Sequence, residues 1–146
     1  NYIRLTQIRF PYSLSYSIKA SDAVRQATVF PLILLMLTEN TIKFNMIMGE
    51  KLHIDIHAEI ITKNHREWVR LLHHDSGEGF SPSVLDILNN RAALSKLSEG
   101  QHVGLYNIIK RLEYFYPEAS IRFYNNDGAA IAIEMPYNCH QFSPEN

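Results

Sequence analysis

A polar cluster interrupts a segment that otherwise has the composition of a buried helix. Apolar residues fill 31–37, and Glu39, Asn40 and Lys43 follow directly. On a helix, residues three and four apart project to the same side. Two interpretations stay open from the spacing alone. One is a solvated face with an i,i+4 ion pair; the other is a metal–phosphate site, because carboxylate and amide oxygens suit Mg²⁺ and Lys43 would lie near phosphate charge.

A second polar stretch, "DSGEGF", follows an expected apolar strand. Asp75 leads it, and Gly77 and Gly79 come next. An ionised carboxylate only accepts hydrogen bonds, so Asp75 suits an exocyclic amine such as that of adenine. The glycines would let the backbone approach a flat ligand where a Cβ would clash. The alternative is an ordinary Asp/Gly turn.

A third stretch, "GQHVGLYN", leads into an amphipathic helix. Gly100 and Gly104 flank the start of this helix. Its N-terminus would expose unpaired N–H groups and partial positive charge, which together attract anions. Asn107, on the first turn, could contact a ligand or simply face solvent.

The intervening patterns predict the elements that must position these residues. In the first half we expect a helix over 1–10, a strand over 14–18, a polar loop over 20–28, a helix over 31–44, and a hairpin of strands 52–58 and 68–72. In the second half we expect a short helix over 82–90 capped by Ser81, a mobile segment over 90–101, and a helix over 104–115. Strands 121–123 and 131–135 around "NNDG" and a frayed tail from 138 complete the chain. Hairpins mixed with helices, without a repeating βαβ unit, predict a two-layer α+β sandwich. Its sheet is mixed and mostly antiparallel, with helices on one face.

Composition limits the functional classes. The chain has 146 residues, of which 46% are hydrophobic and 20% charged, enough for one domain with a substantial core. A net charge of -1 gives no broad field for nucleic acid. The single cysteine, Cys139, excludes an internal disulfide and a thiolate cage for a metal. The longest apolar run, 29–37, is short of the roughly 20 residues that span a bilayer.

The seven histidines do not form an obvious metal site. His73 and His74 are adjacent on an expected strand and therefore point to opposite faces. His53 and His57 share a strand face but lie about 13 Å apart, too far to chelate one ion.

Four motifs in register resemble one family. The helix "PLILLMLTENTIKF" (31–44) resembles the N box of the ATPase domain of sensor histidine kinases. "DSGEGF" (75–80) is similar to its first glycine box, "HVGLYNIIKRL" (102–112) to its second, and "DGAAIAIEMP" (127–136) to the last box and closing strand. "YIRLTQIRF" and "NIIKRLEYFY" resemble the YesM-like and LytS-like subgroup.

The resemblance implies a fold and a set of residue roles. The fold is the GHKL (Bergerat) α/β sandwich of gyrase, Hsp90 and MutL ATPase domains, with ATP held between the N-box helix and a lid over 90–101. On the N-box helix, the resemblance implies that Asn40 binds Mg²⁺, that Glu39 positions or polarises the attacking group, and that Lys43 neighbours the phosphates. In the first glycine box, it implies that Asp75 accepts a hydrogen bond from the adenine amine and that Gly77 and Gly79 shape the adenine pocket. In the second, Gly104 and Leu105 would lie where the lid meets the phosphate-facing helix, and His102 and Asn107 would complete the nucleotide-binding set.

Three positions depart from the family pattern. Ser76 replaces the usual Asn of the first glycine box, which removes one polar group near the nucleotide. His102 stands where many members have Gly, and Ala129 replaces a common Thr. None of the three is Glu39, Asn40 or Asp75, so the resemblance implies nucleotide binding more directly than catalytic competence.

The resemblance also implies an assignment for the whole chain. Residues 1–10 would end a preceding dimerisation helix, 11–137 would form the catalytic domain and 138–146 a tail, so that the chain is a fragment of a longer protein. The domain would transfer the γ-phosphoryl group of Mg·ATP to a histidine on a separate dimerisation domain, since 1–10 contains none. A response regulator would be a partner, the full-length protein a homodimer, and the location the cytoplasmic side of a bacterial membrane.

Two other functional classes remain as alternatives. A degenerate GHKL domain could serve as an interaction module that binds no nucleotide, and the three departures favour that alternative. A GHKL ATPase could instead use ATP for clamping or dimerisation, as the gyrase relatives do. The "QIRF" and "RLEYFY" stretches favour the kinase over this second alternative.

Overall fold

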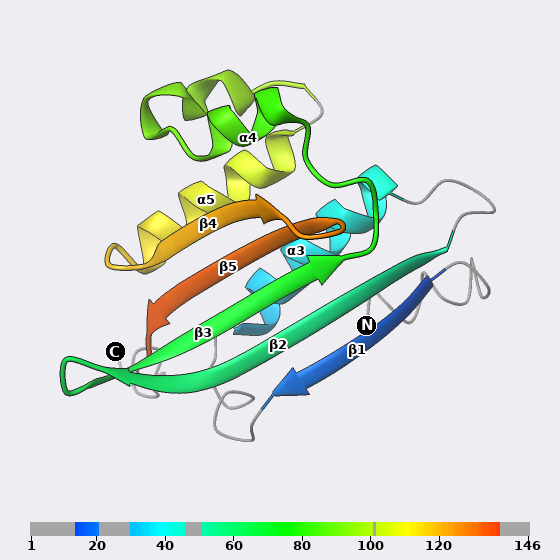
Figure 1. Ribbon diagram of the computed structural model, residues 1–146. Helices are drawn as coiled ribbons and strands as arrows, with labels where there is room; N and C mark the ends of the chain where they lie inside the picture. The colour runs from blue at the N-terminus through cyan, green and yellow to red at the C-terminus, as the bar shows by residue number, and fades with distance from the viewer. Residues whose placement is uncertain (1–13, 21–29, 46–50, 101, 138–146) are drawn as a thin grey trace.

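The sheet and its helices occupy separate layers. The computed structural model describes residues 14–20, 30–45, 51–100 and 102–137. The elements are β1 (Leu14–Ala20), α3 (Phe30–Asn45), β2 (Leu52–Lys63), β3 (Arg66–Asp75), α4 (Pro82–Leu88), the 3-10 helix η1 (Arg91–Leu97), α5 (Val103–Phe115), β4 (Ser120–Asn125) and β5 (Ala129–Pro136) (Figure 1). The helix expected over 1–10, most of the loop over 20–28 and the tail from 138 lie outside the described residues.

The five strands form one mixed sheet in the order β1-β2-β3-β5-β4. β1 pairs parallel with β2, and the other three pairings are antiparallel. Helices α3 and α5 lie together behind the sheet in Figure 1. The predicted α+β sandwich, with a mostly antiparallel sheet and helices on one face, is therefore confirmed.

The hairpin of β2 and β3 forms because alternating residues face the helices. Ile54, Ile56 and Ala58 are buried, while Asp55 and His57 between them are exposed. The connecting turn places Asn64 and His65 at φ 51° and 63°. Left-handed backbone of this kind is a turn conformation that Asn and His adopt more readily than β-branched residues.

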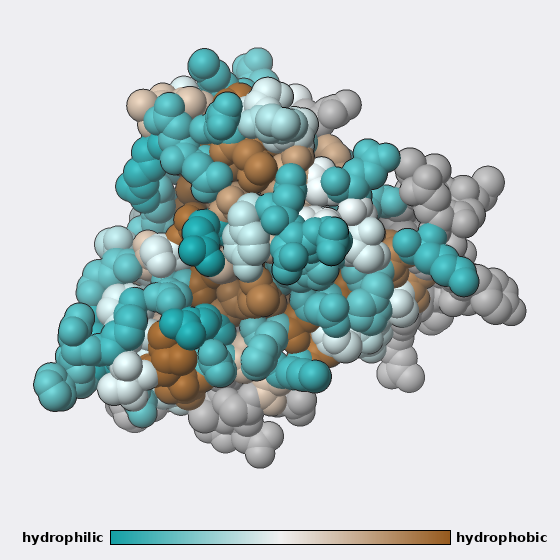
Figure 2. Space-filling view, viewed as in Figure 1, coloured by the Kyte–Doolittle hydropathy of each residue, from teal (hydrophilic) through white to brown (hydrophobic). Residues whose placement is uncertain are grey.

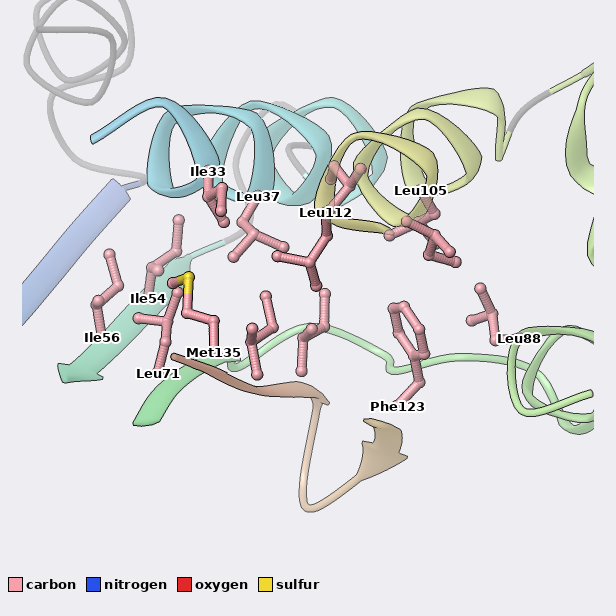
Figure 3. Packing of buried hydrophobic residues seen from close by; sticks show 14 of the residues in the cluster. Ile33, Leu37, Ile54, Ile56, Leu71, Leu88, Leu105, Leu112, Phe123 and Met135 are labelled. Atoms are coloured by element: carbon pink, nitrogen blue, oxygen red, sulfur yellow. The ribbon is translucent and has the colours of Figure 1, made fainter. Parts of the chain in front are cut away.

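The core lies between the two helices and the sheet (Figure 3). In α3, Ile33 and Leu37 are one turn apart, and both are buried and face the strands. Leu105 and Leu112 of α5 lie beside them, as Figure 3 shows. Burying one leucine of this kind contributes about 1.5–3 kcal/mol, so the contact between α3 and α5 holds both helices on the sheet.

One prediction for secondary structure is wrong. The weak periodicity of 90–101 suggested a mobile segment, but residues 91–97 form η1, capped by the Asn90 side chain at Ala92 N. Leu94 and Leu97 are buried in the core. The two leucines are three residues apart, a spacing that 3-10 and α-helices share, and two buried positions are too few to show a periodicity.

The opposite face of the sheet has no helix over it among the described residues. Figure 2 views this face, and hydrophilic side chains predominate on it, with apolar patches between them. Ion pairs cross its strands: Glu134 of β5 binds Lys63 of β2 at 2.6 Å and Arg70 of β3 at 3.2 Å.

Candidate functional site

A cavity of about 230 Å³ opens between the helices and one end of the sheet. It is formed by the second half of α3, the start of α5, the end of β3, the start of β5, and the segment leading into α4. Its lining residues are Asn40, Thr41, Phe44, Asn45, His73, Asp75, Glu78, Gly79, Phe80, Ser81, Val84, His102, Leu105, Ala129 and Ile131.

The cavity brings together five of the ten predicted site residues. These are Asn40, Asp75, Gly79, His102 and Leu105, which come from three separate segments. The first glycine box and the second therefore meet the N-box helix in one place, as the resemblance implied.

The other five predicted residues lie outside the lining. Glu39 and Lys43 are exposed on α3. Gly77 lines a neighbouring pocket with Lys51 and Ser76, and Asn107 is exposed beside Lys110 and Tyr114. Gly104 stands next to Asn40 at the cavity wall. The functional roles of all ten residues stay predictions.

The helix α3 turns Asn40 toward α5 while its neighbours anchor the helix. Thr41 and Ile42 are buried, and Asn40 is half-buried. A Cβ on Gly104 would lie 2.8 Å from Asn40 Oδ1, closer than real Cβ atoms approach an oxygen. Gly104 therefore lets the first turn of α5 approach the Asn40 amide, which explains a glycine at this position without any ligand.

Asp75 ends β3 as a buried carboxyl group at the cavity. It is 2% exposed, and its Oδ1 accepts from Gly77 N at 2.8 Å and from Ala129 N at 3.3 Å. Burial raises the pKa of Asp75, although the two N–H donors and the nearby His74 oppose that rise. The backbone of both glycine-containing turns thus fixes the carboxyl group in one position.

The turn before β5 closes tightly over the end of β3. Gly128 has a φ of +127°, and a Cβ there would lie 1.8 Å from the Asp75 carbonyl oxygen. No other residue type fits both the backbone conformation and the space. At Gly77 a Cβ would lie 2.1 Å from Asn45 Oδ1, so the Asn45 side chain would have to move. The neighbour at this position is protein and not ligand.

A buried histidine lies two residues before Asp75 on the same face of β3. His73 is 1% exposed, and its Nε2 lies 3.4 Å from Thr38 Oγ1 of α3. Burial, and then the neighbouring His74, lower the pKa of His73 to about 4. The ring is therefore neutral at pH 7 and serves as part of the cavity wall. This placement agrees with the expectation that His73 and His74 face opposite sides of the sheet.

His102 precedes α5 and stacks on α3. Its ring centroid lies 5.1 Å from that of Phe44, with 21° between the planes. Its Nδ1 is buried and has no hydrogen-bond partner in the part of the chain that the structure describes. The backbone φ of His102 is −103°, so a histidine in place of the family's glycine causes no left-handed strain here.

The other two departures from the family pattern also have local explanations. The Ser76 hydroxyl accepts from His53 N at 2.8 Å, and Ser76 N donates to His53 O at 2.9 Å. Ser76 thus connects the loop to β2. Ala129 lines the cavity and keeps a backbone donor there, because its N–H binds Asp75.

Sequence reasoning missed several lining residues that a simple projection could have found. Thr41, Phe44 and Asn45 lie one, four and five positions after Asn40, the spacing of one helical face. His73 and Ile131 follow from strand alternation with Asp75 and Ala129. Phe80 and Val84, by contrast, come from a loop and a short helix whose direction no periodicity predicts.

The donor set is compatible with one Mg²⁺ ion that keeps most of its waters. Asn40 supplies an amide oxygen at the cavity, and Mg²⁺ in nucleotide sites usually takes one or two protein ligands and substrate phosphates. Within the described ranges, no group of three or more His, Cys, Asp or Glu residues could hold a metal ion. Any metal held there would depend on oxygens from a ligand.

Comparison with known proteins identifies relatives across nearly the whole chain. No family model matches it. The sensor protein LytS of Oceanobacillus iheyensis is 30% identical over 141 residues, which cover 94% of this chain and 24% of that protein. LytS of Streptococcus mutans is 31% identical over 140 residues, covering 93% and 23%. The sensor histidine kinase/phosphatase LytS of Staphylococcus aureus is 28% identical over 138 residues. The chain thus spans about a quarter of the length of these curated relatives.

Solved structures share the fold at lower identity. The catalytic domain of histidine kinase ThkA superposes with a TM-score of 0.58 at 18% identity, covering 95% of this chain and 92% of that one. The kinase domain of a blue-light activated histidine kinase from Erythrobacter litoralis gives 0.58 at 14%, covering 92% and 59%. In the described part of this chain, no helix is long and apolar enough to cross a membrane.

Proposed function

Since this chain is homologous to the LytS sensor histidine kinases and has the fold of a histidine kinase catalytic domain, we propose that it binds ATP in the cavity between α3 and β3. Its function would be to present the γ-phosphoryl group for transfer to a histidine elsewhere in the full-length kinase. The observation that carries the proposal is the convergence of Asn40, Asp75 and Leu105 on one cavity, from three segments far apart in the sequence.

The adenine base would lie against the end of β3. Asp75 is a buried acceptor whose Oδ1 is held by two backbone N–H groups, so it could accept from the exocyclic amine without reorienting. Gly79, Ala129 and Ile131 line the same region and leave room for a flat ring. A fixed acceptor in a mostly apolar wall is the arrangement that gives a pocket its specificity.

The phosphates would lie toward α3 and the start of α5. Asn40 would hold Mg²⁺ there, and the ion would neutralise charge on the phosphate oxygens. The first N–H groups of α5, those of Val103, Gly104 and Leu105, would add partial positive charge. Lys43 would approach the phosphates, and Glu39 would position or polarise the attacking group, each from the exposed side of α3. In such transfers, positioning and charge neutralisation supply most of the catalysis.

The remaining parts of the reaction belong to the longer protein. We propose that the acceptor histidine stands on a dimerisation domain preceding residue 11, that the full-length kinase is a membrane-bound homodimer with this domain in the cytoplasm, and that a response regulator receives the phosphoryl group. The gene upstream of Asn1 tests this. Membrane spans and a helix bearing a histidine are expected; their absence would favour a GHKL ATPase that uses ATP for clamping.

Calorimetric titration of the 146-residue chain with ATP, with and without Mg²⁺, tests the binding function. We expect saturable binding that Mg²⁺ strengthens. Asn40→Ala should abolish the Mg²⁺-dependent part while leaving the thermal unfolding midpoint nearly unchanged, because a half-buried amide contributes little to the core. No binding at millimolar ATP would overturn the proposal and favour the interaction module that binds no nucleotide.

A further inference from the structure

The cavity that we assign to ATP contains few positively charged groups. Its charged or titratable lining residues are His73, Asp75, Glu78 and His102, and no Lys or Arg is among the lining residues that the structure describes. His73 is neutral at pH 7, and its Nε2 already faces Thr38. A ligand carrying several phosphate groups therefore needs hydrogen-bond donors other than Lys and Arg side chains, and His102 is the remaining histidine that lines the cavity.

The two ring nitrogens of His102 are not equivalent. Nδ1 is buried without a partner among the described residues. A buried N–H that lacks an acceptor pays its full desolvation cost, so the neutral ring is expected to carry its proton on Nε2 and a lone pair on Nδ1. The part of the chain that the structure describes also gives Nε2 no hydrogen bond, so the ring has one N–H to offer.

The position of this donor is fixed by its neighbours. The stack on Phe44 holds the ring plane against α3. The Asn40 amide lies beside Gly104, two residues further along the chain. His102 therefore belongs to the wall formed by α3 and the start of α5, while the acceptor Asp75 belongs to the end of β3. The cavity has a hydrogen-bond donor on one wall and an acceptor on another.

We infer that His102 donates its Nε2–H to a phosphate group of the bound nucleotide and so distinguishes nucleotides from nucleosides. This inference rests on the proposed function. It gives a ligand contact to a residue that many relatives of this domain replace with glycine. Stacking on Phe44 makes Phe44 a positioning residue for the contact, since it fixes the ring without touching the phosphate itself.

The test compares ATP, ADP and adenosine binding to the 146-residue chain and to His102→Phe. Phenylalanine can keep the stack on Phe44 but has no N–H. Because hydrogen bonds to charged groups are among the stronger ones, we expect about a tenfold to hundredfold loss of affinity for ATP and ADP, and less than about a twofold change for adenosine. His57→Phe, on the exposed face of β2, is the matched control and should bind all three as the unchanged chain does.

A nitrogen-15 spectrum of the imidazole rings gives a second readout that needs no variant. Free His102 should show the Nε2–H tautomer, and its Nε2 resonance should shift with ATP but not with adenosine. The inference would be overturned if His102→Phe lost affinity for ATP and for adenosine equally, or if ATP did not shift the Nε2 resonance. The binding function would stand in either case. Failure of the unchanged chain to bind any nucleotide would instead overturn the proposed function and the inference with it.

Discussion

At the scale of single residues, the Asp75 carboxyl group is the feature that most limits what the cavity can bind. It is buried, it ends a central strand, and its Oδ1 already accepts two backbone hydrogen bonds. A polar group held in this way recognises a ligand by geometry, because it cannot turn to suit another one.

Asp75→Ala should therefore lower the affinity for ATP by about tenfold to a hundredfold, the usual range for a hydrogen bond to a charged group. The affinity for GTP should fall much less, because guanine carries no amine at that ring position. Competition titrations with the two nucleotides measure the difference. Asp55→Ala removes an exposed carboxylate from the open face and is the control. Equal weakening of ATP and GTP would show that Asp75 does not read the base.

His73 should make the fold sensitive to acid. Its folded pKa of about 4 lies below the ordinary value of 6.5, so between these two values the unfolded chain binds more protons than the folded one. The stabilising contribution is present above pH 6.5 and is lost as the pH falls toward 4. It amounts to about 3 kcal/mol.

Urea unfolding at pH 7 and pH 4.5 tests this prediction. The free energy of unfolding should fall less for His73→Gln than for the unchanged chain, since glutamine does not titrate but can still face Thr38. His57→Gln, an exposed histidine on β2, should fall as far as the unchanged chain. If His73→Gln retained the full loss on acidification, other groups would account for it.

At the scale of elements, the turn before β5 contacts both the backbone and the side chain of Asp75. Gly128 approaches the Asp75 carbonyl, and the next residue, Ala129, donates to the Asp75 side chain. Any shift of this turn should therefore move the carboxyl group as well.

Gly128→Ala should destabilise the chain by about 3 kcal/mol or more, because left-handed strain of about 1–2 kcal/mol adds to a clash with backbone. Gly100→Ala is a matched control. Gly100 also has a positive φ, +95°, but nothing lies within 4 Å of its added Cβ. Gly100→Ala should therefore lower the free energy of unfolding only by the cost of the backbone strain. Thermal unfolding of both variants measures the difference, and equal losses would contradict the packing described for Gly128.

The sequence patterns predicted the regular elements well and their contacts less well. The helix α3, the hairpin and α5 follow from apolar periodicity, and the Ser81 cap follows from "SP", which begins α4 with the serine oxygen at Val84 N. The 3-10 helix was not predicted because its two buried leucines are too few to show a periodicity. Motif position could not show that Asn107 faces away from the cavity, because the direction of a residue depends on how α5 rotates against α3.

The candidate site was predictable where motifs end elements and unpredictable where elements meet. Type and spacing drew attention to Asp75, at the end of a strand, and to Asn40, on the polar side of an otherwise apolar helix. Only the resemblance of four motifs in register favoured ligand roles for them over a turn and a solvated face. The stack of His102 on Phe44 and the contact between Thr38 and His73 cross from one element to another. Such contacts depend on tertiary packing, which a single sequence does not reveal.

At the scale of the whole molecule, the two faces of the sheet have different tasks. The helix-covered face holds the core and, at one end, the cavity. The opposite face carries ion pairs and exposed polar side chains (Figure 2). Exposed pairs of this kind contribute little to stability, typically below about 1 kcal/mol each. The fold therefore depends on the layer between α3, α5 and the strands, and a bound nucleotide should stabilise that layer.

The most direct test of this account is a map of backbone amide resonances during titration of the 146-residue chain with Mg·ATP. We predict that the largest shifts occur in the second half of α3, in 75–84, at the start of α5 and in 129–131, with the open face of β1 and β2 unaffected. Saturable shifts confined to that open face, or spread evenly over the chain, would contradict a nucleotide site between α3 and β3.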